Sequence, residues 1–195
     1  PASETPASAD SAGSSHDGDQ PSQQFAVGDP APAFNNLIGT DDQRHSLSDY
    51  ADAKAVAIVF TCNHCPVAQD YEERLVALHS DYADKGVQIV AINVNNLEAD
   101  KLPAMKTRAA EKGFEFPYLY DPSQQAGRRY GATVTPHAFL LDGERNLAYV
   151  GPIDDSQQEA SVTKRYLRDA IDAVLAGSAP TTAEVKPFGC GIKYE

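Results

Sequence analysis

The stretch that decides the fold is Ala55-Val56-Ala57-Ile58-Val59-Phe60-Thr61-Cys62-Asn63-His64-Cys65-Pro66. Its first six residues are apolar, and an uninterrupted run of this kind is typical of a strand that is covered on both faces. Pro66 suits the first turn of a helix, where its missing backbone N–H costs nothing. The sequence therefore predicts that Cys62 lies at a strand-to-helix corner, with Cys65 one turn inside the helix.

Helical periodicity follows this corner. Apolar side chains recur at spacings of three and four, at Val67, Tyr71, Leu75, Leu78 and Tyr82. Gly86 then ends the predicted helix, and residues 87–94 form a second buried apolar run. A strand, a helix and a second strand in this order predict a right-handed βαβ unit with a parallel strand pair.

The flanking sequence supplies the remaining elements of an α/β domain, which we place at residues 25–178. Upstream, residues 34–38 and 43–47 flank a turn sequence and predict a β-hairpin. Downstream, the predicted elements are a helix at 97–112, a strand at 116–120, a helix from Asp121 to Tyr130, strands at 137–142 and 146–150, and a helix at 162–175. Residues 179–195 form a C-terminal extension that contains a Gly-Cys-Gly sequence.

The first 24 residues contrast with this domain. They contain no aliphatic side chain larger than Ala, no aromatic residue, no Lys and no Arg, so they cannot bury enough apolar surface to fold. We predict a disordered, acidic, Ser- and Pro-rich leader over residues 1–24. Such a leader favours an extracytoplasmic protein, periplasmic or tethered to the envelope, although cysteine usage leaves a cytoplasmic location open.

Composition narrows the range of partners. The 195-residue chain carries a formal net charge of −12, which argues against nucleic acid and anionic membrane surfaces as partners. No apolar run approaches the roughly 18 residues of a membrane-spanning helix. We expect a monomer without a membrane span.

The spacing of Cys62 and Cys65 predicts redox chemistry. Two thiols at this spacing form a reversible disulfide, and the N-terminus of a helix favours a thiolate over a thiol. Cys62 is therefore the predicted nucleophile and Cys65 the predicted resolving thiol. A protonated His64 would stabilise the thiolate further, so we predict that His64 tunes the reactivity of Cys62.

At this point the chain resembles the thioredoxin-like redoxins, specifically their AhpC/TSA-like, peroxiredoxin-like group, which is related to TlpA/ResA-type thiol-disulfide oxidoreductases. The resemblance covers roughly residues 25–177. It rests on the order of elements, on the motif at residues 62–66 and on the sequence Gly131-Ala132-Thr133-Val134-Thr135-Pro136-His137-Ala138-Phe139-Leu140-Leu141-Asp142, which looks like the cis-proline loop of that family. It implies a thioredoxin fold: a central mixed β-sheet flanked by helices, with an N-terminal β-hairpin extension and an inserted helix.

The resemblance also implies roles for residues of the loop. The Thr135–Pro136 bond would be cis and would face Cys62 and Cys65, and Thr135 and His137 would contact an extended substrate segment. The implied activity is thiol–disulfide exchange with a partner protein, with no cofactor apart from the redox-active disulfide. Two departures from thioredoxins favour a specialised partner: Thr61 replaces an aromatic residue, and Val56 stands where a buried acid is found.

Two alternative functions stay open. A thiol peroxidase is one, because the chain also resembles peroxiredoxins, but no proline precedes Cys62 at the spacing that their Pro-x-x-x-Thr-x-x-Cys loop requires. A copper- or zinc-binding metallochaperone is the other, because soft ligands are present at Cys62, His64, Cys65, His137 and Cys190. The sequence lacks a second CxxC, so we predict no resident metal site.

The third cysteine, Cys190, lies between two glycines, which suggests a tight approach of the backbone to another part of the protein. It could be a third redox thiol that reaches the active site, or a small hydrophobic residue buried beneath the C-terminal segment. We favour the second interpretation.

Overall fold

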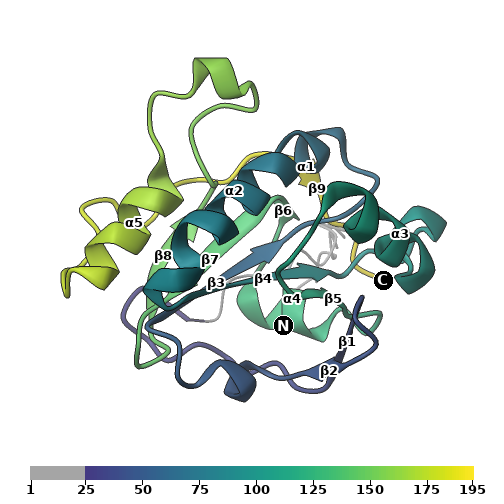
Figure 1. Cartoon of the computed structure of the whole chain (residues 1–195), viewed down its shortest axis with the longest axis horizontal. Helices are drawn as coiled ribbons and strands as arrows, with labels where there is room; N and C mark the ends of the chain where they lie inside the picture. The colour runs from purple at the N-terminus through teal and green to yellow at the C-terminus, as the bar shows by residue number, and fades with distance from the viewer. Residues whose placement is uncertain (1–24) are drawn as a thin grey trace, which may run out of the picture.

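The computed structural model describes residues 25–195, so the predicted leader at 1–24 lies outside the described residues. A seven-stranded mixed sheet forms the centre of the domain, in the order β2-β1-β5-β4-β3-β7-β8 (Figure 1). Its strands are β1 (Leu37–Gly39), β2 (Arg44–His45), β3 (Ala55–Phe60), β4 (Val87–Asn93), β5 (Tyr118–Tyr120), β7 (His137–Leu141) and β8 (Leu147–Gly151). The predicted α/β, thioredoxin-like architecture is confirmed.

Strand β3 is the centre of this sheet, and every one of its residues is buried. It runs parallel to β4, as the predicted βαβ unit requires, and antiparallel to β7. The predicted N-terminal hairpin is confirmed as well, because β1 pairs with β2 and then extends the sheet through β5. All-apolar composition suits β3 because both of its faces are covered.

Helices cover both faces of the sheet. The α-helices are α1 (Pro66–Asp70), α2 (Glu72–Tyr82), α3 (Leu102–Lys112), α4 (Gln125–Tyr130) and α5 (Tyr166–Leu175), and the 3-10 turns are η1 (Leu47–Tyr50), η2 (Ala83–Lys85), η3 (Glu98–Asp100) and η4 (Glu159–Ser161). Ala57 and Val59 of β3 belong to a core cluster with α2, α3 and α5. Ile58 and Phe60 point to the other face, where they belong to a cluster with α4. Alternation along β3 thus divides the core into two layers.

All four predicted helices differ in their bounds. The single helix predicted after Pro66 is interrupted at Tyr71, which separates α1 from α2 and donates a hydrogen bond from its hydroxyl to Asp154 at 2.6 Å. The helix predicted from residue 97 begins at Leu102, after the turn η3 and an extended Lys101. The helices predicted at 121–130 and 162–175 begin at Gln125 and Tyr166. Turns or extended residues thus replace the first or middle turn of each predicted helix.

The C-terminal segment adds a small second sheet that the sequence did not predict. Strand β9 (Cys190–Gly191) pairs antiparallel with β6 (Val134–Thr135), directly before β7, and lies beside α1 (Figure 1). Gly189 makes this approach feasible, because a Cβ at this residue would lie 2.1 Å from the carbonyl oxygen of Thr135. Within residues 25–195, no helix combines the length and apolar character needed to cross a membrane.

Candidate redox site

The two motif cysteines lie at the carboxyl end of β3, at the corner that the sequence predicts. Both are buried, with Cys62 3% and Cys65 0% exposed. Cys65 is the N-cap residue of α1, and its sulfur accepts a hydrogen bond from the backbone N–H of Ala68 at 3.4 Å. The prediction that Cys65 lies one turn inside the helix is therefore wrong by one turn.

The disulfide at this corner joins Cys65 to Cys190, and Cys62 is a free, buried thiol. The predicted Cys62–Cys65 bridge is thus not the bridge that this structure contains. The interpretation of Cys190 as a mere buried hydrophobe is also wrong. The cause is the pairing of β9 with β6, which brings a residue 125 positions away in the sequence against Cys65.

Thr135 contacts all three cysteines. Its peptide bond to Pro136 is cis, which confirms the prediction for this loop. Its side-chain oxygen lies 3.2 Å from the sulfur of Cys62, at hydrogen-bond distance, and its carbonyl oxygen lies 3.5 Å from the sulfur of Cys65. In the β6–β9 ladder Thr135 is the register partner of Cys190. The cis-proline loop therefore faces the redox corner.

His137 lies in β7 directly after Pro136 and is 4% exposed. Its Nδ1 lies 3.4 Å from the backbone N–H of Thr133, and its ring is 4.5 Å from that of Phe139. Burial lowers the pKa of His137 to about 4, so the ring is neutral at pH 7. A role of His137 in substrate binding stays a prediction.

A buried carboxylate, Asp100, organises the residues between the two motif cysteines. Asp100 is 0% exposed and comes from η3. One of its oxygens accepts hydrogen bonds from the backbone N–H of Asn63 at 2.7 Å and the side chain of Asn93 at 3.1 Å. Its other oxygen lies 2.5 Å from Nδ1 of His64. A buried acid therefore contacts the motif from η3, although Val56 of β3 is apolar.

The side chain of Asn63 is fixed on both sides. Its amide donates to the carbonyl oxygen of Ala99 at 2.7 Å, and its oxygen accepts a hydrogen bond from the hydroxyl of Tyr118 at 2.9 Å. Sequence reasoning missed Asp100 and the polar role of Tyr118. In the sequence, Asp100 resembles an ordinary acid at the start of a helix, and Tyr118 resembles an aromatic residue that packs on the sheet. The chain gives no local signal that these residues face the motif.

Burial raises the pKa of the Cys62 thiol to about 11. The hydrogen bond with Thr135 lowers this pKa without outweighing the loss of hydration, and the negative charge of Asp100 raises it further. The predicted thiolate is therefore wrong for this disulfide state, in which Cys62 is a thiol at pH 7. Hydrogen bonds from the backbone N–H groups of Cys65 and His64, at the start of α1, lower this pKa as well, but burial has the largest effect.

The donor set available to a metal differs from the predicted one. Cys65 and Cys190 are consumed by their disulfide. Ligand atoms of Cys62, His64 and Asp100 all lie within 4.8 Å of one another. These three could bind a borderline ion such as zinc only if His64 or Asp100 gave up part of the hydrogen bonding described above.

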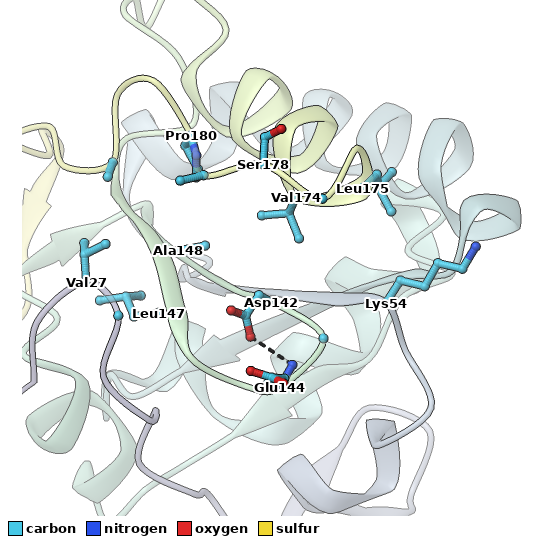
Figure 2. A pocket seen from close by; sticks show the side chains of 15 residues that line it. Val27, Lys54, Asp142, Glu144, Leu147, Ala148, Val174, Leu175, Ser178 and Pro180 are labelled. Atoms are coloured by element: carbon cyan, nitrogen blue, oxygen red, sulfur yellow. Dashed lines mark hydrogen bonds between the residues drawn. The ribbon is translucent and has the colours of Figure 1, made fainter.

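A broad cavity of about 660 Å³ lies near the start of β3 and the turn between β7 and β8 (Figure 2). It is bordered by Lys54 before β3, by Asp142 and Glu144 in the turn between β7 and β8, and by Val174 of α5. None of the three cysteines lines it. The redox corner and this cavity are therefore separate features.

The AhpC/TSA family matches residues 27–150, which include the corner, the cis-proline loop and most of the sheet. The chain belongs to the AhpC/TSA family. The matched residues end before Cys190, so the family match covers Cys62 and Cys65 and leaves the third cysteine outside it.

Individual relatives agree with this assignment. The chain is 26% identical over 122 residues to the thiol-disulfide oxidoreductase ResA of Bacillus anthracis, a match that covers 62% of this chain and 66% of that protein. It is 26% identical over 133 residues to the thiol:disulfide interchange protein DsbE of Allochromatium vinosum, covering 66% of this chain and 68% of that protein. These relatives support an oxidoreductase at the level of reaction class.

A solved structure covers more of the chain. A hypothetical protein from Sinorhizobium meliloti is 35% identical, with a TM-score of 0.83, and the alignment covers 90% of this chain and 98% of that one. This similarity extends the shared fold beyond the residues that the family matches.

Proposed function

We propose that this protein is a thiol-disulfide oxidoreductase that exchanges a disulfide with a partner protein through Cys62 and Cys65. The observation that carries the proposal is the position of the two cysteines at the end of β3, opposite a cis Thr135–Pro136 bond, with Thr135 within hydrogen-bond distance of the Cys62 sulfur. This arrangement places two cysteines and the cis-proline loop at one corner, and exchange with a partner disulfide needs an attacking and a resolving cysteine close to each other.

The reaction proceeds in two balanced steps from the form in which Cys62 and Cys65 are both thiols. The Cys62 thiolate attacks one sulfur of the partner disulfide and releases the other as a thiolate, which takes up a proton. The Cys65 thiolate then attacks Cys62, forms the Cys62–Cys65 disulfide and releases the second partner thiol. The same steps in reverse oxidise a partner dithiol. No cofactor enters either direction.

Deprotonation of Cys62 is the demanding part of this sequence. Cys62 is 3% exposed and its pKa is about 11 in the Cys65–Cys190 form, so a partner must reach its sulfur after that bridge has opened or moved. His64, paired with Asp100, lies next to the thiol and tunes it in our proposal. Because the net charge is −12, we propose a protein partner rather than nucleic acid, with the chain acting as an extracytoplasmic monomer.

No comparable structural observation supports the alternative function, a thiol peroxidase. Thr61 directly precedes Cys62, so the Pro-x-x-x-Thr-x-x-Cys spacing is absent. The two arginines of α4 that could have replaced a peroxidase arginine are engaged elsewhere: Arg128 lies over the ring of Tyr194, and Arg129 donates to the carbonyl oxygen of Ala33. We therefore propose protein disulfide exchange as the single function.

Reduction of insulin disulfides in the presence of dithiothreitol tests the proposal, because insulin precipitates when its chains separate. The wild-type chain should accelerate precipitation, and Cys62→Ser should lower the rate to that of dithiothreitol alone. Circular dichroism checks that the variant is folded. Equal rates for the wild type and Cys62→Ser, or no acceleration by the wild type, would overturn the proposal.

A further inference from the structure

The three cysteines form one small cluster, in which Cys62 and Cys65 are buried and Cys190 is partly buried. Cys62, Cys65 and Ala68 make a separate cluster, and Cys190 and Val67 pack against it. Cys65 can pair with either of the other two cysteines: it is three residues from Cys62 in the sequence and is bonded to Cys190 in the structure. Cys62 is the free thiol next to an existing disulfide, which is the geometry from which thiol–disulfide exchange starts.

The C-terminal segment that carries Cys190 is held by contacts other than the disulfide. Ile192 is 2% exposed and donates its backbone N–H to the carbonyl oxygen of Thr133 at 2.9 Å. Gln124 donates to the carbonyl oxygen of Lys193 at 2.9 Å and accepts from the backbone N–H of Glu195 at 2.8 Å. These contacts do not involve sulfur, so breaking the bond between Cys65 and Cys190 removes none of them directly.

Tyr194 adds a further anchor. Its hydroxyl donates to the carbonyl oxygen of Ala132 at 2.6 Å, and it lies so close to α4 that a Cβ at Gly127 would be 2.5 Å from the hydroxyl oxygen. A segment held at four successive residues keeps Cys190 next to Cys65 in either redox state. The local concentration of the third thiol therefore stays high, as it does for any tethered and docked reactant.

We propose that Cys190 is a second resolving thiol, and that Cys65 passes its disulfide back and forth between Cys190 and Cys62. This inference rests on the proposed function and deepens it. The step is an internal exchange: the Cys62 sulfur attacks the Cys65 sulfur, a Cys62–Cys65 bond forms, the Cys65–Cys190 bond breaks, and Cys190 leaves as a thiolate. Cys62 loses a proton and Cys190 gains one. The number of disulfides is unchanged, so no external oxidant or reductant is consumed.

Exposure gives the two forms different roles. In the Cys65–Cys190 form the nucleophile Cys62 is a buried thiol, protected from the oxidation to sulfenic and higher acids that affects accessible thiolates. In the Cys62–Cys65 form the disulfide lies on the pair that exchanges with the partner. The C-terminal segment thereby stores the oxidising disulfide without leaving the nucleophile open to over-oxidation.

Native trapping with iodoacetamide tests the transfer. The oxidised chain, which has one free thiol, is incubated with iodoacetamide at pH 8, and samples taken over time are digested without reduction and mapped by mass spectrometry. The alkylating agent should accumulate on Cys190, because each transfer exposes that thiol, and the remaining disulfide should become Cys62–Cys65. In Cys62→Ser, the matched control, the Cys65–Cys190 bridge should stay intact and Cys190 unlabelled.

Two outcomes would overturn the inference: label on Cys62 with an intact Cys65–Cys190 bridge, or no label on Cys190 over a time in which the urea-unfolded chain is fully labelled. The insulin experiment separates this inference from the proposed function. Transfer without insulin reduction would refute partner exchange alone, and insulin reduction without label on Cys190 would refute the third thiol alone.

Discussion

The redox corner at residues 62–66 and the C-terminal segment at residues 189–195 each present a cysteine to Cys65. Cys62 is three residues away in the sequence, and Cys190 is 125 residues away, yet the structure joins Cys65 to the distant one. Proximity in sequence therefore identifies Cys62 as a thiol that can react with Cys65, whereas strand pairing makes Cys190 the thiol that is bonded to it. Both partners touch the same residue, Thr135, which makes the cis-proline loop the meeting point of the two regions.

The two regions are also held by different side chains. The corner depends on the buried carboxylate of Asp100, which accepts from the backbone of Asn63. The C-terminal segment depends on Gln124 and on the buried Ile192. Because these supports are separate, a substitution in one region should leave the other in place, and the comparison can be tested region by region.

The largest effect is expected from Cys65→Ser, which removes the sulfur that both regions share. Neither disulfide can form, so insulin reduction should fall to the level of dithiothreitol alone, and a Cys62 mixed disulfide with a protein substrate should accumulate because no thiol resolves it. Non-reducing gels and mass spectrometry measure the trapped complex. Cys190→Ser serves as the control and should trap none; resolution at a normal rate in Cys65→Ser would show that Cys190 acts directly on Cys62.

The next effect is a reversal of the disulfide pattern. Gly189→Ala places a Cβ 2.1 Å from the carbonyl oxygen of Thr135, which β9 cannot accommodate while it pairs with β6. The oxidised variant should contain mainly Cys62–Cys65, as mapped by mass spectrometry. Gly191→Ala is the matched control, because a Cβ there meets no atom within 4 Å, and it should keep Cys65–Cys190. The same pattern in both variants would refute the role that we assign to strand pairing.

A smaller effect concerns stability. The Cys65–Cys190 bridge closes a loop of 125 residues, and in the chain-entropy account a loop of this length stabilises the folded state by about 3–5 kcal/mol. Oxidised Cys190→Ser should therefore unfold at a lower urea concentration than the oxidised wild type, and the difference should disappear when both are reduced. Cys62→Ser keeps the bridge and should change the free energy of unfolding by about 1 kcal/mol or less. Equal stability of oxidised wild type and oxidised Cys190→Ser would argue against a persistent bridge.

The subtlest test is the pH dependence of the internal transfer in the oxidised wild type. Because the pKa of Cys62 is raised to about 11, its thiolate fraction should grow roughly tenfold for each pH unit between 7 and 10. Attack by that thiolate starts the transfer, so the rate at which iodoacetamide labels Cys190 should rise accordingly, without a plateau. Cys62→Ser is the control and should show no such rise. A plateau below pH 8 in the oxidised wild type would show that burial does not control this thiol.

Most elements of the fold follow from patterns of a few residues. The apolar run of β3, the periodicity after Pro66 and the glycines at helix ends are local, and the structure confirms the elements that they predict. Gly86 and Gly113, for example, end their helices with positive φ angles of 85° and 66°. The helix bounds were less accurate, because contacts such as the Tyr71–Asp154 hydrogen bond interrupt a helix that its own sequence would continue.

The candidate site was predictable only in part. Cys62, Cys65 and the cis bond before Pro136 came from motifs, and the structure places them together. Asp100, which organises Asn63 and His64, was not predicted from any motif, because an acid at the start of a helix is already explained by its favourable interaction with the helix dipole. The protonation state of Cys62 was mispredicted for a related reason: its pKa depends on how completely distant residues bury it, and helix position says nothing about that.

The sequence by itself determined the α/β fold, the strand-to-helix corner and the presence of two thiols at CxxC spacing, because these depend on the periodicity and conformational preferences of neighbouring residues. Only the tertiary structure decided which thiols are bonded, which carboxylate faces them and whether Cys62 is ionised. Those properties depend on contacts between residues that lie tens of positions apart, and on the loss of hydration that such contacts cause.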